Sequence, residues 1–141
     1  MAEAYLRSLH IKNLEVISSG TVAEINADIN GPLSIYARPV LEHHKILQYA
    51  KPMWDQLTPE RLHPNDLVIC MNQLVFYDCK DIAPLPGEVL VWNILDFNEY
   101  EAIHQRVLSE SERVQYAEGV YQQIKKKIDD LVLNLPTPQQ Y

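Results

Sequence analysis

The chain has 141 residues, of which 47% are apolar and 22% charged, as is ordinary for one globular domain. Its formal charge of −7 disfavours binding to nucleic acid or to an anionic membrane, because phosphate groups would be repelled. No apolar run reaches the ~20 residues that cross a bilayer, and Met1–Leu9 lacks the pattern of a secretory signal. These features predict a cytoplasmic protein with one domain over residues 1–135 and a flexible tail at 136–141.

The first third of the chain predicts a short helix followed by strands. Met1–Leu9 carries apolar residues on one helical side, and residues 11–17 fit a strand somewhat better than a helix. Residues 23–30 alternate apolar and polar side chains, and the alternation resumes at 33–38 after the Gly31-Pro32 turn. Such alternation is typical of antiparallel strands with one buried face, so we predict a three-stranded meander.

The middle third predicts a helix and then a hairpin. Residues 40–50 follow Pro39, a favourable first helical residue, and Lys51-Pro52 should end that helix. Residues 67–71 and 74–77 are apolar on both faces, and Asn72-Gln73 between them fits a tight turn. This register separates Cys70 from Cys79, so no disulfide is expected.

The last third predicts a buried strand followed by helices. Residues 88–95 are almost wholly apolar, and Asp96 with Glu99 resembles a helix N-cap pair. Ser109 with Glu112 fits a capping box at the start of a long amphipathic helix over 110–135. The predicted fold is therefore α+β, with a mainly antiparallel sheet of five to six strands packed against C-terminal helices.

No motif for a metal, cofactor or catalytic nucleophile is present. His43 and His44 are adjacent, so on a helix they point about 100° apart and do not easily share a metal. No H-x-x-x-H or C-x-x-C spacing is present, so we predict no metal and no cofactor. Cys70 lies in an apolar strand, where a thiol is usually inert. Cys79 lies beside Lys80 and is interpreted as a packing residue, with a more exposed and acidic thiol as the alternative.

These absences, together with surplus apolar surface, favour a protein-interaction module without catalytic activity. It would be an adaptor, a chaperone-like protein or an inhibitor of the immunity type, and its partner would be another protein or a second copy of the chain. The predicted binding residues surround the helix break at Pro52, where aromatic and methionine side chains gather. They are Met53, Trp54, Leu57 and Tyr49.

Two alternatives remain open. One is a small enzyme or ligand-binding domain whose site is assembled from distant polar residues in loops and at element ends. Its candidate residues are Arg38, His43, His44, Asp55, His63 and Cys79. The other is a structural component of a viral or cellular assembly.

Overall fold

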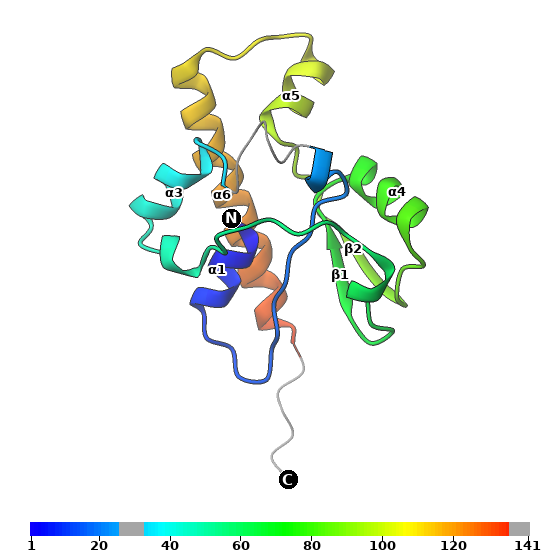
Figure 1. Ribbon diagram of the computed structural model, residues 1–141. Helices are drawn as coiled ribbons and strands as arrows, with labels where there is room; N and C mark the ends of the chain where they lie inside the picture. Colours follow the sequence, from blue (N-terminus) through cyan, green and yellow to red (C-terminus); the bar gives the residue numbers. More distant parts are fainter. Residues whose placement is uncertain (26–32, 136–141) are drawn as a thin grey trace.

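The computed structural model describes residues 1–25 and 33–135 (Figure 1). Strands β1 (Leu67–Cys70) and β2 (Glu88–Val91) lie parallel, with Leu67 opposite Glu88 and Cys70 opposite Val91. Helix α4 (Gln73–Ile82) connects them, so strand, helix and parallel strand form a βαβ unit of α/β type. The prediction of an α+β fold with a five- to six-stranded antiparallel sheet is therefore wrong.

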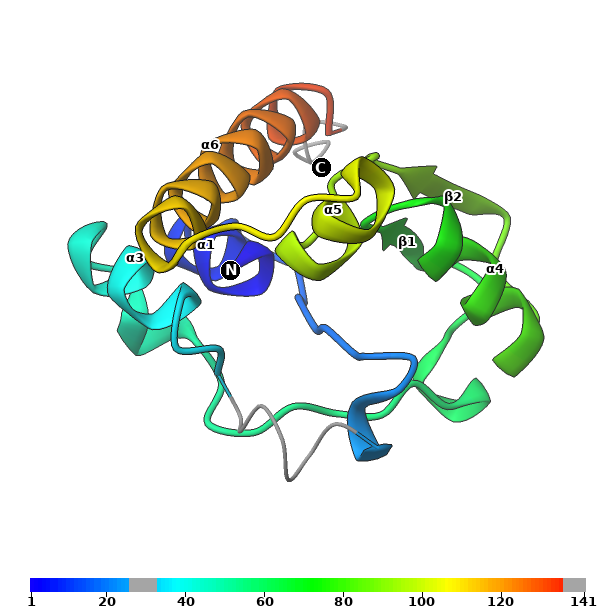
Figure 2. The same cartoon turned by 90° about the horizontal axis from the view of Figure 1, so that it is seen from above.

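Helices cover both faces of this small sheet. In Figure 2 the long helix α6 lies on one side of the strands and α4 on the other. The remaining described helices are α1 (Ala2–Ser8), α3 (Ala37–His43), α5 (Phe97–His104), α6 (Glu110–Leu133) and the 3-10 turns η1 (Leu47–Tyr49) and η2 (Pro59–Arg61). None of the helices within the described residues is long and apolar enough to cross a membrane.

The main core lies where α6 packs against α1 and α3, on one side of the sheet. Ile69 and Leu90 approach it from the strands, while Leu41 of α3 and Tyr121 and Ile128 of α6 are almost completely buried in it. A smaller cluster occupies the other face, where Cys70 of β1 packs with Cys79 of α4 and with Leu57. Coverage of both faces by apolar groups is what parallel strands require.

Helix α6 confirms the predicted long amphipathic helix. The Ser109 hydroxyl accepts a hydrogen bond from the Glu112 amide, and the Glu112 carboxylate accepts one from the Ser109 amide at 2.8 Å. This capping box satisfies two amides at the helix N-terminus. Gly119 is exposed, and a Cβ added there would meet nothing within 4 Å, so the glycine is not needed for close packing.

The predicted N-terminal meander does not form. Residues 11–17 form no strand, residues 23–25 are helical, and 26–32 lie outside the described part of the chain. Residues 33–36 lead by a turn into α3, which ends at His43 and not at residue 50. Alternation alone did not identify strands here, because a strand also needs a neighbour to pair with and pack against.

The predicted hairpin at Asn72-Gln73 is a helix start. Asn72 caps α4, since its side-chain oxygen accepts a hydrogen bond from the Val75 amide at 3.0 Å. Leu74 and Tyr77 are 60% and 55% exposed, whereas Cys79 faces the sheet. The chain after β1 therefore crosses over to a parallel strand and does not return beside β1.

The packing of α6 gives a first prediction. Ile128→Ala should lower the free energy of unfolding by about 2–5 kcal/mol, because it leaves a cavity where the side chain is now 1% exposed. Leu133→Ala, at an 82% exposed position of the same helix, is the matched control and should change it by less than about 0.5 kcal/mol. Urea unfolding measures both, and equal losses would contradict the assigned core face.

Candidate functional site at the carboxyl edge of the sheet

The carboxyl ends of β1 and β2 lie at one edge of the sheet, because the two strands are parallel. Helix α4 begins at this edge with Asn72 as its N-cap, and α5 begins there with Asp96. Figure 1 shows both helices above the strand ends. Ligands of open α/β sheets bind outside the carboxyl ends of the strands. This edge is therefore the first place where the fold would position a functional site.

Asn72 joins the two segments that leave the strands. Its side chain is almost fully buried, with 4% of the residue exposed. The amide nitrogen donates to both carboxylate oxygens of Glu99, at 2.9 and 2.8 Å, while the amide oxygen caps α4. A hydrogen bond to a charged group is worth about 1.5–3 kcal/mol, so this contact should fix the start of α5 relative to that of α4.

Asp96 is an exposed carboxyl group held in a defined position. One of its oxygens accepts a hydrogen bond from the Glu99 amide at 2.8 Å, and the Glu99 carboxylate accepts one from the Asp96 amide at 2.9 Å. This capping box fixes the Asp96 side chain at the N-terminus of α5. Its second oxygen makes no hydrogen bond with the described residues, which leaves it available to a ligand.

Backbone amides at the same edge provide hydrogen-bond donors. The side chains of Asn72 and Asp96 occupy the third amide of α4 and of α5. The first two amides of each helix have no hydrogen-bond partner among residues 1–25 and 33–135: those of Gln73, Leu74, Phe97 and Asn98. The positive end of a helix dipole and free amides together favour an anion.

Aromatic rings surround the start of α5. Phe97 packs edge-on against Tyr36, with ring centroids 5.2 Å apart, and the Arg113 guanidinium lies 5.0 Å from the Phe97 centroid. Tyr116 lies 5.0 Å from Tyr100 and donates a hydrogen bond to the Leu95 carbonyl at 3.0 Å. Burial, followed by the charge of nearby Asp96, raises the pKa of the Tyr116 phenol, so it stays a neutral donor.

Neither cysteine provides a reactive thiolate. Both are buried between α4 and the sheet, at 1% and 6% exposure, and both are free thiols. Burial raises the pKa of Cys70, and burial with the adjacent Cys70 thiol raises the pKa of Cys79 to about 12. Cys79 lies within α4, away from any exposed strand end, so the packing interpretation describes its environment better than the acidic alternative.

The other predicted polar residues are dispersed. Arg38 pairs with Glu42 on the exposed side of α3, where His43 packs against His44. His44 instead bonds Glu118 at 2.8 Å and stacks on the Tyr121 ring. Asp55 is bound by Lys51 and Arg61, and His63 lies in an exposed loop. No group of three possible metal ligands comes together within the described residues.

The four predicted apolar binding residues differ in exposure. Met53 is 59% exposed, whereas Leu57 is buried in the smaller core. Trp54 is half-buried, and the Tyr49 hydroxyl lies 3.0 Å from the His10 ring nitrogen. Two of these four side chains therefore already have partners inside the chain.

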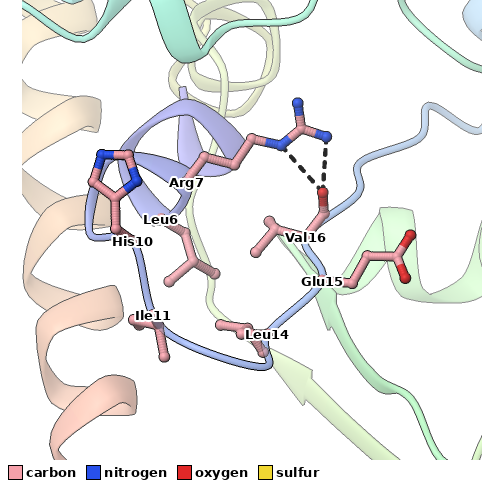
Figure 3. Close-up of a pocket in the computed structure, with 7 residues that line it drawn as sticks. All are labelled: Leu6, Arg7, His10, Ile11, Leu14, Glu15 and Val16. Carbon is pink, nitrogen blue, oxygen red and sulfur yellow. Dashed lines mark hydrogen bonds between the residues drawn. The ribbon is translucent and has the colours of Figure 1, made fainter.

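A separate hollow of about 330 Å³ lies beside the loop after α1 (Figure 3). Its cationic side chain, Arg7, is already engaged: it donates to the Val16 carbonyl and pairs with Glu3 at 2.6 Å. The lining residues are Leu6, Arg7, His10, Ile11, Leu14, Glu15 and Val16. Since its polar groups are engaged or at the rim, this hollow offers fewer free donors than the carboxyl edge.

Sequence reasoning did not assign the edge as a site. It predicted Asp96 and Glu99 as a cap, which is confirmed, but gave them no function, and it placed Asn72 in a hairpin turn. Recognition of β1 and β2 as parallel was the missing step, because only that topology places Asn72 and Asp96 at one edge.

No protein-family model and no curated protein matches the chain. Among solved structures it is similar to Vibrio vulnificus Wzb in complex with benzylphosphonate, with a TM-score of 0.70 and 22% sequence identity. The similarity covers 95% of this chain and 88% of the Wzb chain, and at this identity it shows a shared fold. Wzb is a low-molecular-weight protein tyrosine phosphatase.

This similarity corrects the functional prediction. A fold shared with a phosphatase overturns the interpretation of the chain as an interaction module without catalytic activity. It favours the alternative of an enzyme or ligand-binding domain with a site assembled from distant residues.

The Asn72–Glu99 contact gives a second prediction. Asn72→Asp keeps an oxygen that can cap α4 but replaces the donor to Glu99 with a second negative charge. It should therefore cost about 2 kcal/mol or more of unfolding free energy, as should Asn72→Ala. Urea unfolding measures the loss, with exposed Asn98→Ala as the control. An Asn72→Asp variant as stable as the unmodified chain would show that the contact does not form.

The buried thiols give a third prediction. Iodoacetamide at pH 8 should leave Cys70 and Cys79 unmodified in the folded chain, because both are protonated and covered. In about 8 M urea both should react, since an exposed thiol titrates near pH 8.5. Mass spectrometry counts the adducts, and rapid labelling of either thiol without urea would contradict the burial described here.

Proposed function

We propose that the chain binds aryl phosphate or phosphonate esters at the carboxyl edge of β1 and β2, as a phosphatase-type domain. The observation that carries the proposal is the similarity to Wzb, a tyrosine phosphatase whose structure contains benzylphosphonate. Benzylphosphonate combines a phenyl ring with a phosphorus oxyanion. The carboxyl edge has a group suited to each part.

Free amides at the two helix starts suit the oxyanion. The first amides of α4 and α5 are unpartnered within the described residues, and each helix adds the positive end of its dipole. This local field is needed because the chain as a whole carries a charge of −7 and would otherwise repel an anion. Salt screens the part of this charge that lies far from the edge, and the neutral amide donors act on the oxyanion at short range.

Aromatic side chains next to Asp96 suit the ring of the ligand. Phe97 begins α5, and Tyr36 and Arg113 pack against it. Aromatic pairs in edge-on or offset contact contribute about 0.5–1.5 kcal/mol beyond the area they bury. An aryl ester would therefore bind more tightly than an alkyl ester of the same charge.

Asp96 is the group that we assign to hydrolysis. Cleavage of an aryl phosphate by water breaks the bond between phosphorus and the phenolic oxygen, and that oxygen leaves more readily when it receives a proton. Asp96 is exposed and held by its capping box, and its second oxygen has no described partner. In this scheme the Asp96 carboxyl gives a proton to the leaving phenolic oxygen, water forms the new bond to phosphorus, and the proton that the water loses returns to the Asp96 carboxylate.

Titration of the ¹⁵N-labelled chain with benzylphosphonate tests the binding step. The largest amide shifts should occur at Gln73, Leu74, Phe97 and Asn98. Benzyl alcohol, which lacks the oxyanion, is the control and should cause only small shifts. Shifts confined to the hollow around Arg7, or none at about 10 mM benzylphosphonate, would contradict the proposed site.

Asp96→Asn tests the chemical step. Asn also caps helices well, so the fold should persist, while hydrolysis of phenyl phosphate should fall by about 10²-fold or more. Benzylphosphonate binding should be retained, since Asn removes a negative charge near the anion. Asp78→Asn, at an exposed position in α4, is the matched control. Unchanged hydrolysis by Asp96→Asn would remove this residue from the mechanism.

A further inference from the structure

A second hollow, of about 600 Å³, lies between α4, the loop that follows it and β2. It borders the smaller core, and four of its apolar side chains are only half-buried against that core, whereas Ala83 is 3% exposed. The apolar lining that concerns us comes from Phe76, Ala83, Leu85, Val89 and Val91. Apolar surface of the smaller core is therefore still in contact with solvent on the β2 side of α4.

The periods of helix and strand place these side chains on facing walls. Gln73, Phe76 and Lys80 follow one another at three and four residues, which puts them on one face of α4. Val89 and Val91 are two residues apart in β2 and so point to the same face of the sheet. Both walls belong to the βαβ unit, so the hollow is part of its regular structure.

Lys80 brings a positive charge to the hollow. Its ammonium nitrogen lies 5.4 Å from the centroid of the Phe76 ring, one helical turn earlier. Among the described residues that line the hollow, Lys80 is the only one with a charged side chain. Asp78, Asp81 and Glu88 are close in sequence, but they do not line it, and Lys80 forms no ion pair within the described part of the chain. An apolar hollow with one unpaired ammonium group suits a ligand that is apolar except for one negative charge.

We infer that this hollow binds a free fatty-acid anion of about six to ten carbon atoms, since a hollow of this volume holds a small molecule. The carboxylate lies at Lys80, and the alkyl chain lies against Leu85, Val89 and Val91. An alkyl chain suits this lining better than an aromatic ring does, because the face of the Phe76 ring is already next to the Lys80 ammonium.

The alkyl chain supplies most of the affinity, and the charge selects the ligand. The protein carries −7 overall, so at long range it repels an anion and gains nothing from general attraction. Each methylene that is buried from water strengthens binding by about threefold. The ion pair with exposed Lys80 is weaker than the total from several methylenes, but it distinguishes a carboxylate from a neutral or cationic chain.

This inference does not depend on the proposed ester site. Asp96 and Phe97 do not line the hollow, and Gln73 is the one residue that borders both places. Benzylphosphonate could fail to bind at the carboxyl edge while a fatty-acid anion still binds beside β2. The reverse result is equally informative, so the two proposals fail separately.

Methyl NMR spectra of the ¹³C-labelled chain, recorded with sodium butanoate, hexanoate and octanoate, test the inference. The Leu85, Val89 and Val91 methyl signals should shift, and the affinity should rise by about threefold for each added methylene. No methyl shift at about 20 mM octanoate, or an affinity independent of chain length, would overturn the inference. So would shifts confined to the amides of Phe97 and Asn98, because the carboxylate would then bind at the carboxyl edge.

Lys80→Gln tests the charge with a matched control. Gln is also a good helix former at this exposed position, so the fold should persist. The variant should bind octanoate about three- to fivefold more weakly and hexan-1-ol, which has no charge, as well as the unmodified chain does. Lys126→Gln, at an exposed position of α6, makes the same change in net charge and should leave octanoate binding unchanged. Equal weakening by the two variants would show that Lys80 does not hold the carboxylate and would overturn the inference.

Discussion

The parallel pairing of β1 with β2 is the constraint on which the rest of the structure depends. It requires the chain to cross the sheet between the two strands, and α4 makes that crossing. It also brings the two strand ends to one edge, where Asn72 bonds Glu99 and Glu99 in turn bonds the Asp96 amide. The side chains of Asn72 and Glu99, together with the Asp96 amide, thus connect the start of α4 with the start of α5.

The two cores support that edge from opposite faces. On one face, α6 buries its apolar stripe against α1, α3 and the strands, so its Tyr116 can hold the Leu95 carbonyl just before Asp96. On the other face, Cys70 and Cys79 fill the space between β1 and α4. The two thiols have a packing role in this smaller core, whereas the polar groups at the carboxyl edge do not pack in it. Asp96, in contrast, both caps α5 and has the role that we propose in hydrolysis.

Much of the local structure could be predicted from the sequence, because the signals for it are local. The capping boxes at Asp96 and Ser109 and the long stripe of α6 depend on residues within a few turns of one another. The strand at β1 was also predicted, and β2 lies within the strand predicted over 88–95.

The fold class was not predictable in the same way, and Asn72 shows why. An asparagine oxygen that accepts a backbone hydrogen bond is common both in tight turns and at helix N-caps. The residues after it, Leu74 to Tyr77, are apolar in a pattern that suits either structure over so short a length. Interpreting Asn72 as a turn residue therefore predicted a hairpin in place of a βαβ unit. A hairpin has antiparallel strands, so Asn72 and Asp96 were not expected at the same edge of the sheet.

The most direct test of the account is a crystal structure of the chain with benzylphosphonate. The account predicts that the phosphonate oxygens accept hydrogen bonds from the first amides of α4 or α5, with the ring against Phe97 and the Asp96 carboxyl within reach of the phosphonate. A phosphonate bound elsewhere, with this edge empty, would contradict the claim that the carboxyl ends of β1 and β2 form the functional site.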